Sequence, residues 1–412
     1  MNFFPLVIVA LVLIATSLRS LFPRRMEIWL IMCLGAAAVM LTGSISLKEA
    51  IYSINPDVML FLFFMFILGS VLSKSGFLYV LEYKLFRGAE SADKLLLYII
   101  FSMALLSYFF MNDTIAIIAT PLMIFLSKKH SINHKILLLA LAFSITIGSV
   151  PSPIGNPQNL LIAVKSGIDE PFSVFAGYLL VPSVINLFAV YFVIKIIFRN
   201  DLKEVGILKH EKSDIEDCDS YKKAKVSVFI LIASLVCWVI LKFAFIGIEM
   251  PIYAIPVLPA LFGLASSKRK TEIVKSIDYK TLLFFAGMFV LMKSLYIKQE
   301  PQILFDAAKK AGDVPFTMAI SIFVSQIVSN VPFAALFVDS LKSNATNEIF
   351  TALAAGSTIA GNLFILGAAS NVIIIQKAER EGKTLSFIEF SKCGIILTAV
   401  NFLVYWVYFS LI

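Results

Sequence analysis

The chain has 412 residues, of which 59% are hydrophobic and only 15% charged, with a formal net charge of +8. These proportions exclude an ordinary soluble enzyme or binding domain and indicate a polytopic membrane protein. The sequence has none of the aromatic-and-basic patches that are typical of nucleic-acid-binding proteins, so we expect no nucleic-acid partner. We expect the excess positive charge to face anionic lipid headgroups of the bilayer.

The first half of the chain contains apolar runs long enough to cross a membrane. We place these crossings at residues 3–22, 27–44, 57–74, 135–166 and 173–198. The first run lacks the basic start and cleavage site of a signal peptide, so we expect it to be retained. Between the third and fourth crossings, segment 94–128 has two marginal apolar arms around Asn112, which predicts a re-entrant hairpin. The fourth crossing is long because it contains a break.

The second half repeats this order, with a hairpin at 314–342 and a broken helix at 348–381. Its crossings lie at 223–246, 251–266, 279–297, 348–381 and 387–412. Five crossings per half is an odd number, so the second copy must be inverted relative to the first. The spacings agree with a copy: Asn371 follows Asn159 by 212 positions, and Gly367 follows Gly155 by the same number.

The sequence therefore predicts an all-α polytopic membrane protein made of two inverted repeats, residues 1–198 and 223–412. Each repeat has five transmembrane helices, including one discontinuous helix, and a re-entrant hairpin. Cytoplasmic loops carry an excess of Lys and Arg, and the predicted loops on one side hold most of the 35 basic residues. This bias predicts that both termini lie on the extracytoplasmic side of the cell membrane and that residues 199–222 form a cytoplasmic linker.

Chemistry is expected at the breaks, where interrupted helices leave N–H groups for anions and carbonyl groups for cations. We expect half-helices to begin at Thr114, Pro157 and Pro332. Asparagine amides supply both donors and acceptors, although for any single Asn a purely structural helix cap is the alternative. The candidate substrate- and ion-binding residues are Asn112, Asp113, Thr114, Gly155, Asn156, Asn159, Ser329, Asn330, Gly367, Ser370 and Asn371.

Asp113 is the only acidic residue placed at a break, and Val331 stands beside Asn330 instead. An ionisable group at membrane depth is a functional hypothesis, here proton or cation coupling, with a dipole-stabilised N-terminal carboxylate as the alternative. The four cysteines show no paired spacing, and His130 and His134 lie among lysines. We therefore expect no disulfide framework, no metal centre and no cofactor other than a sodium ion or proton as coupling ion.

Several segments resemble the ion transporter superfamily, on its arsenite-efflux and sodium/proton-antiporter branch, with the divalent-anion/sodium symporters as more distant relatives. They are Asn112-Asp113-Thr114 with Thr120-Pro121, Ile154 to Leu160, Ser329-Asn330-Val331-Pro332, and Gly356 to Asn371. The resemblance implies a transport domain that carries substrate beside a scaffold domain, with dimerisation through the scaffold and, in some systems, a docked cytoplasmic ATPase. It also implies an ion site at Asn112, Gly155 and Asn156, with sodium as one candidate, and a counterpart at Asn330 and Gly367 to Asn371.

This chain departs from the symporter pattern at Met111 and at Val331-Pro332, and it offers fewer membrane carboxylates than a sodium/proton antiporter. A small oxyacid such as arsenite, antimonite or silicate fits an amide-rich site with one acid. We therefore expect a secondary transporter of such a small inorganic anion or oxyacid. Sodium/proton antiport and sodium-coupled carboxylate symport are the alternatives. A membrane-embedded enzyme would need facing aspartates or an acidic metal cluster, and a channel would not need two broken helices.

Overall fold

A computed structural model of the chain describes residues 4–18, 26–203, 208, 217–244, 250–297, 313–328, 330–341 and 346–412. Every regular element among these residues is a helix, which confirms the all-helical fold. Five of these helices are long and apolar enough to cross a membrane, namely Pro56–Lys74, Ala92–Phe109, Pro171–Ile197, Cys218–Leu241 and Phe387–Leu411. The inverted relation of the two repeats stays a prediction.

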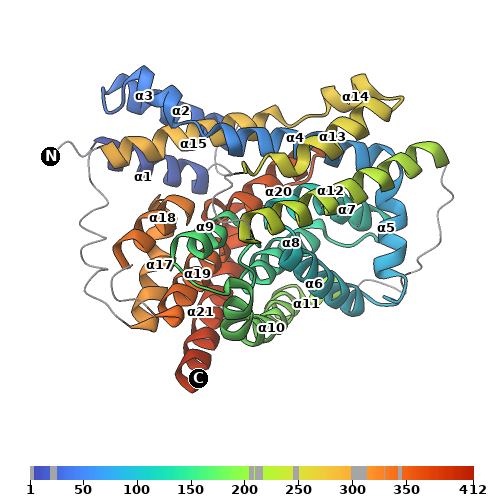
Figure 1. Cartoon of the computed structure of the whole chain (residues 1–412). Helices are drawn as coiled ribbons and strands as arrows, with labels where there is room; N and C mark the ends of the chain where they lie inside the picture. The colour runs from blue at the N-terminus through green and yellow to red at the C-terminus, as the bar shows by residue number, and fades with distance from the viewer. Residues whose placement is uncertain are drawn as a thin grey trace. The chain divides into compact units, whose positions relative to one another are not determined.

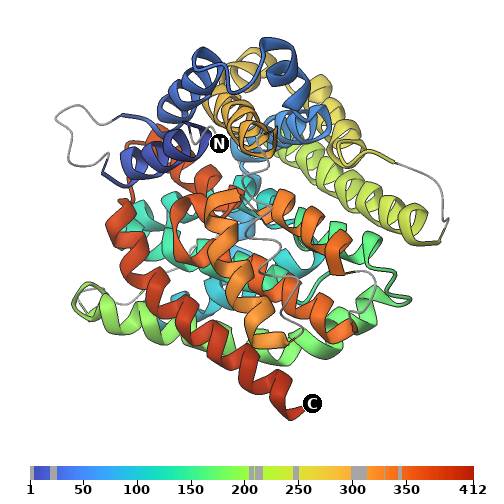
Figure 2. The same ribbon diagram turned by 90° about the vertical axis from the view of Figure 1, so that its left-hand side faces the viewer.

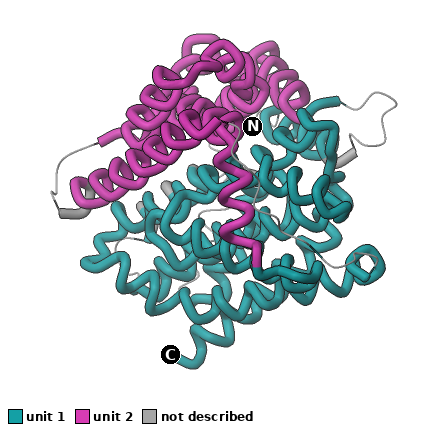
Figure 3. Tube along the Cα trace, turned by 90° about the vertical axis from the view of Figure 1, so that its right-hand side faces the viewer, with its two compact units in different colours: residues 1–27, 88–208, 294–412 teal, residues 28–87, 209–293 magenta. Residues whose placement is uncertain are grey.

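The chain forms two compact units, each assembled from both halves of the sequence (Figure 3). Unit 1 comprises residues 1–27, 88–208 and 294–412, and unit 2 comprises residues 28–87 and 209–293. Both expected hairpins and both expected discontinuous helices fall in unit 1. The units therefore do not coincide with the two predicted repeats, whose boundaries remain a prediction.

Unit 2 is a helical bundle in which α4 packs against α12 and α13 (Figure 1). Its helices are α2 (Ile28–Leu41), α3 (Leu47–Ser53), α4 (Pro56–Lys74), α5 (Phe77–Phe86), α12 (Cys218–Ala244), α13 (Ala254–Ser266), α14 (Lys270–Lys275) and most of α15 (Tyr279–Ile297). Helix α3 begins with a capping box between Ser46 and Glu49, and α4 begins with Asn55 as its cap and Pro56 in its first turn. Both patterns are strong helix-start signals.

Unit 1 contains the hairpins and the broken helices. Its helices are α1 (Phe4–Leu18), α6 (Ala92–Phe109), α7 (Asn112–His130), α8 (His134–Ser149), α9 (Pro157–Lys165), α10 (Pro171–Ile197), α11 (Arg199–Lys203), α17 (Val314–Val328), α18 (Asn330–Leu341), α19 (Asn347–Leu363), the 3₁₀ helix η2 (Ile365–Gly367), α20 (Ala369–Arg380) and α21 (Phe387–Leu411). Helices α6 and α7 form the first hairpin, and α17 and α18 form the second. Each broken helix is a pair, α8 with α9 and α19 with α20.

The helices of unit 1 pack in the same pattern in both halves of the chain. The first arm of each hairpin packs on the first part of the broken helix that follows it, α6 on α8 and α17 on α19. The second arm of each hairpin packs on the second part of the other broken helix, α7 on α20 and α18 on α9. Figure 2 shows the red and orange helices of the second half crossing those of the first within this unit. The exchange ties the two halves into one body.

Apolar side chains from both halves fill the space around the second hairpin. Phe175 of α10, Met318 of α17, Phe333 and Phe337 of α18, and Tyr405 of α21 belong to one buried cluster. Such close-packed interiors resist any change in volume. Helices approach most closely where a glycine leaves room, as at Gly148 of α8, where an added Cβ would overlap the backbone of Ala104 in α6.

We expect Gly148→Ala to destabilise the protein by about 1–3 kcal/mol, because the new methyl group would push α8 away from α6. Gly177→Ala is the matched control: it also lies inside a helix, α10, but an added Cβ there meets no atom within 4 Å. The control should stabilise the protein by about 0.5–1 kcal/mol through helix propensity. Thermal unfolding in detergent measures both, and equal effects would contradict the packing argument.

Candidate functional site

The first break separates α8 from α9 at a proline-rich segment. Pro151 and Pro153 follow the end of α8 and cannot donate the backbone hydrogen bonds that would continue the helix. Helix α9 then starts at Pro157, as the sequence predicts, with Asn156 as its cap. The Asn156 Oδ1 atom accepts a hydrogen bond from the Asn159 backbone N–H at 2.8 Å.

Asn159 satisfies the carbonyl groups that the break leaves behind. Its Nδ2 donates to the carbonyl oxygens of Ser149, Val150 and Ser152 at 3.1, 3.1 and 3.0 Å. These carbonyls lie at and beyond the end of α8, where no helical partner is available. Asn159 is fully buried, so its amide replaces the water that would otherwise be needed.

The second break uses the same contact at equivalent positions. The Asn371 Nδ2 donates to the carbonyl oxygen of Gly361 at 2.6 Å. Asn371 and Gly361 follow Asn159 and Ser149, respectively, by 212 positions. The short helix η2 fills this second break, which contains no proline. A repeated amide-to-carbonyl bond at a constant spacing supports the repeat that the sequence predicts.

Each hairpin tip meets the break of its own half. The Asn112 backbone N–H donates to the Gly155 carbonyl oxygen at 2.8 Å, and the Asn330 Nδ2 donates to the Gly367 carbonyl oxygen at 2.8 Å. Gly155 and Gly367 are closely surrounded, since an added Cβ would overlap the carbonyl oxygens of Ser149 and Ala360. Each hairpin tip is thus hydrogen-bonded to a glycine at a position where a larger residue would not fit.

Two expected helix starts are wrong by two residues: α7 begins at Asn112 rather than Thr114, and α18 begins at Asn330 rather than Pro332. Pro332 is tolerated inside the first turn because the N–H groups there have no intrahelical acceptor. Ser329, another predicted site residue, lies outside the described residues.

Thr358 of α19 joins the two halves at the first break. Its hydroxyl donates to the Asn159 Oδ1 at 3.1 Å and accepts from the Asn156 Nδ2 at 3.2 Å. The Asn156 Nδ2 also donates to the Ser149 hydroxyl at 3.0 Å. The sequence analysis missed Thr358 and Ser149, because hydroxyl residues inside helices carry no break signal. The one available hint is that Thr358 follows Thr146 by the repeat spacing of 212.

The other asparagines retain acceptor oxygens with no partner in the described part of the chain. These buried atoms are Oδ1 of Asn112, Asn330 and Asn371, together with the Ser370 hydroxyl. An unmatched buried polar atom costs about 1–3 kcal/mol unless a ligand or water meets it. Amide carbonyl oxygens can bind a cation or accept a hydrogen bond from a hydroxylated solute. Asn330 and Asn371 therefore hold the second break through their Nδ2 atoms, while their Oδ1 atoms have no partner among the described residues.

Asp113 and Thr114 lie in the first turn of α7, the helix that packs on α20 of the other half. Both are buried, with only 7% of Asp113 exposed. No described residue forms an ion pair with Asp113. A buried carboxylate without a cationic partner is costly to ionise. Its position next to Asn112 keeps it among the candidate site residues.

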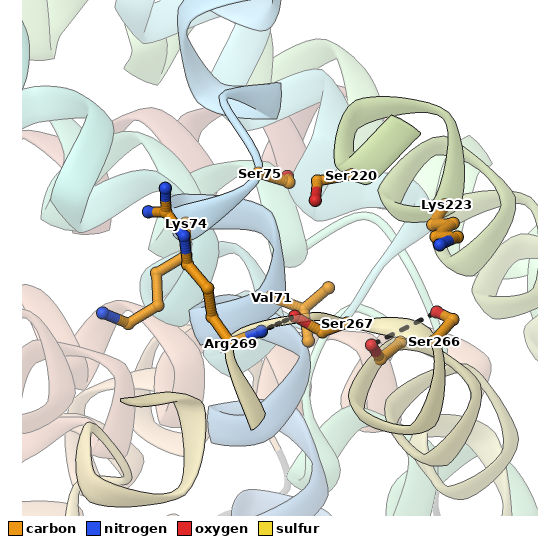
Figure 4. Close-up of a pocket in the computed structure, with 9 residues that line it drawn as sticks. Val71, Lys74, Ser75, Ser220, Lys223, Ser266, Ser267 and Arg269 are labelled. Atoms are coloured by element: carbon orange, nitrogen blue, oxygen red, sulfur yellow. Dashed lines mark hydrogen bonds between the residues drawn. The ribbon is translucent and has the colours of Figure 1, made fainter. Parts of the chain in front are cut away.

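Unit 2 has a polar pocket of a different kind, shown in Figure 4. Its lining residues are Val71, Lys74, Ser75, Ser220, Lys223, Gly263, Ser266, Ser267 and Arg269. Lys74 forms an ion pair with Glu272 at 3.2 Å, and Lys223 forms one with Asp219 at 2.7 Å. Since both lysine charges are matched and no helix is interrupted here, the breaks in unit 1 are the stronger candidate site.

We expect Thr358→Val to weaken transport and lower stability by about 1–3 kcal/mol, because it leaves the buried amide oxygen of Asn159 without a donor. Thr146→Val is the control, since the Thr146 hydroxyl donates only to the carbonyl of Ala142 in its own helix. Transport in vesicles and thermal unfolding measure the two variants. Identical behaviour would show that the contact between the halves has no special role.

Buried polar groups at interrupted helices inside an apolar helical bundle are typical of membrane transporters rather than enzymes. The model of the citrate transporter family (CitMHS) matches residues 8–348, and the chain belongs to this family. It is therefore a secondary transporter, and the expectation that it is not an enzyme is confirmed.

The relatives of the chain include other transporters. An uncharacterized transporter of Mycobacterium bovis is 26% identical over 421 residues, covering 96% of each chain. The putative transporter arsB of Dictyostelium discoideum is 23% identical over 481 residues, covering 90% of this chain and 85% of the relative. The crystal structure of the YdaH transporter of Alcanivorax borkumensis aligns over 99% of this chain and 96% of its own, at 14% identity with a TM-score of 0.49.

Proposed function

We propose that the protein moves a small oxyanion or metalloid oxyacid, such as arsenite, antimonite or silicate, by alternating access coupled to a proton or sodium gradient. The observation that carries the proposal is the set of buried amide oxygens of Asn112, Asn330 and Asn371, which have no hydrogen-bond partner in the described part of the chain. Hydroxylated oxyacids can donate hydrogen bonds to such oxygens.

The helix starts complete the proposed recognition of the oxyacid. Helices α7, α18 and α20 begin at or beside the unpartnered oxygens, and the N–H groups of a first turn favour an oxygen or a negative charge. None of the predicted site residues is a lysine or arginine. This supports a neutral or weakly acidic substrate over a multiply charged one, because no side chain would neutralise several negative charges.

The proposed coupling ion binds near the first hairpin tip. Asp113 can exchange a proton, and the Asn112 Oδ1 can contribute to a sodium site together with the Gly155 carbonyl. Asn156 is a weaker sodium ligand than the sequence suggests, because its Oδ1 caps α9 and its Nδ2 already has two acceptors. Its role as a helix cap is what the contacts support.

A second candidate function is cation-coupled symport of citrate or a dicarboxylate. The description of the matching family, which names citrate, favours it. In that case the coupling cation, rather than a basic side chain, would neutralise the carboxylates. The substrate comparison below separates the two candidates.

We further propose an elevator-type cycle in the cell membrane, in which unit 1 carries the substrate. Support comes from the segregation of both breaks and both hairpins into one compact unit. Unit 2 would then be the scaffold through which a homodimer forms. The basic loops support extracytoplasmic termini, and an ATPase partner, if one docks, would meet the cytoplasmic linker.

We expect Asp113→Asn to abolish the dependence of transport on an imposed pH gradient, since an amide cannot carry the proton. The variant should still fold, because the amide has nearly the shape of the carboxylate. Flux of arsenite, silicate, citrate and sodium into vesicles under separate proton and sodium gradients measures this. Unchanged pH dependence would remove Asp113 from coupling.

We expect Asn112→Ala and Asn330→Ala each to weaken substrate affinity about tenfold, the equivalent of one lost hydrogen bond of about 1.4 kcal/mol. Asn55→Ala is the control, because Asn55 caps α4 in unit 2 and lies outside both breaks. Binding of the transported substrate is measured by calorimetry. Similar losses in all three variants would argue against a site at the hairpin tips.

A further inference from the structure

Helix α21 carries a stripe of buried polar side chains, although it is one of the long apolar helices. Ser391, Thr398, Asn401 and Tyr405 are each at most 8% exposed. With Gly394, they recur at intervals of three and four residues, which places them on one face of the helix. Helix α21 packs against α10 and α19, and it is the red helix that ends at the C-terminus in Figure 2.

Polar residues of α10 and α19 meet this stripe. The hydroxyls of Ser183 and Tyr405 share a hydrogen bond of 2.6 Å, and the Asn362 Nδ2 donates to the Asn401 Oδ1 at 3.0 Å. Asn186 lies beside the Tyr405 hydroxyl. All five side chains are at most 2% exposed. They form a polar cluster inside unit 1 that the proposed transport cycle does not use.

Four atoms of the stripe and cluster have no hydrogen-bond partner among the described residues. They are Oδ1 of Asn362, Nδ2 of Asn401, and the hydroxyls of Thr398 and Ser391. Buried hydroxyls in helices commonly donate to a carbonyl one turn back. Thr120 does so, donating to the Ala116 carbonyl, whereas Thr398 and Ser391 do not. Each buried atom left without a hydrogen-bond partner would lower the stability of the protein by about 1–3 kcal/mol.

The unpartnered atoms include donors and acceptors, which identifies the matching ligand. A bare cation would satisfy the oxygens but would repel the Asn401 Nδ2 group. Water both donates and accepts, and buried water binds where two to four such groups converge. The chemistry of the cluster therefore fits water.

The stripe packs directly on the end of α19 beside the second break. Ser391 follows the Ser386–Glu389 capping box, and Glu389 pairs with Lys135 at 2.5 Å. Further along, an added Cβ at Gly394 would overlap the carbonyl oxygen of Asn362, the next-to-last residue of α19 before the break. From Ser391 to Tyr405 the helix rises about 21 Å, a large part of a hydrocarbon core of about 30 Å.

We propose that α10, α19 and α21 enclose bound water at the polar cluster of Thr398, Asn401 and Asn362, beside Asn186 and Tyr405. This water would satisfy the buried amides behind the second break. It is separate from the hairpin tips, where substrate is proposed to bind.

Radiolytic hydroxyl labelling of the full-length protein tests the bound water, because water held at the cluster is activated in place and marks the side chains it touches. Tyr405 should be labelled at least about tenfold faster than Phe390, an aromatic residue of α21 with the same exposure of 0%. Labelling of Tyr405 at the rate of Phe390 would overturn the proposal. The double variant Asn362→Leu, Asn401→Leu provides the second measurement.

This variant removes both members of a bonded pair, a change that folded proteins tolerate better than removal of one. It should reduce labelling of Tyr405 to the rate of Phe390 while the melting temperature stays near that of the unmodified protein. Undiminished labelling in a folded variant would overturn the assignment of the water to these asparagines. If the variant does not fold, the comparison of Tyr405 with Phe390 in the unmodified protein decides alone.

Discussion

A helix that is interrupted inside a membrane releases backbone groups that lipid cannot satisfy, so the protein must supply every partner itself. Asparagine amides do this at both breaks. Asn159 donates hydrogen bonds to three carbonyl oxygens at the first break, and Asn371 donates to the equivalent carbonyl at the second. Without these contacts the breaks would be too costly to keep, and the polar groups around them could not be held at fixed positions.

Once the breaks are satisfied, the remaining polar atoms become available for a ligand. The side-chain amides of Asn156 and Asn159 are used in hydrogen bonds to the backbone and to Thr358. Asn330 binds the Gly367 carbonyl through its Nδ2 and Asn112 binds the Gly155 carbonyl through its backbone N–H, and the Oδ1 atoms of both have no partner among the described residues. The same residue type thus has two roles, and contacts rather than sequence distinguish them. The division also explains why the candidate site can be polar while the surrounding helices remain tightly packed.

Much of this architecture could be predicted from the sequence, because long apolar runs and repeated breaks are strong local signals. The expected crossing at 279–297 coincides with α15, and the start of α9 at Pro157 is correct. Contacts between distant segments could not be predicted. Nothing in the pattern around Thr358 indicates that it meets Asn156. The grouping of segments into two units also follows from tertiary packing, which a linear pattern does not encode.

The contact between Asn156 and Thr358 joins residues 202 positions apart. A ribosome adding about 5–20 residues per second needs about 10–40 seconds to make that much chain. During this interval the first broken helix already exists, but the hydroxyl that will close its polar end has not been synthesised. The nascent first half must therefore wait, with water or the insertion machinery meeting its amides, until the later helices arrive. Unit 1 can therefore complete its packing only after the second half of the chain has been made.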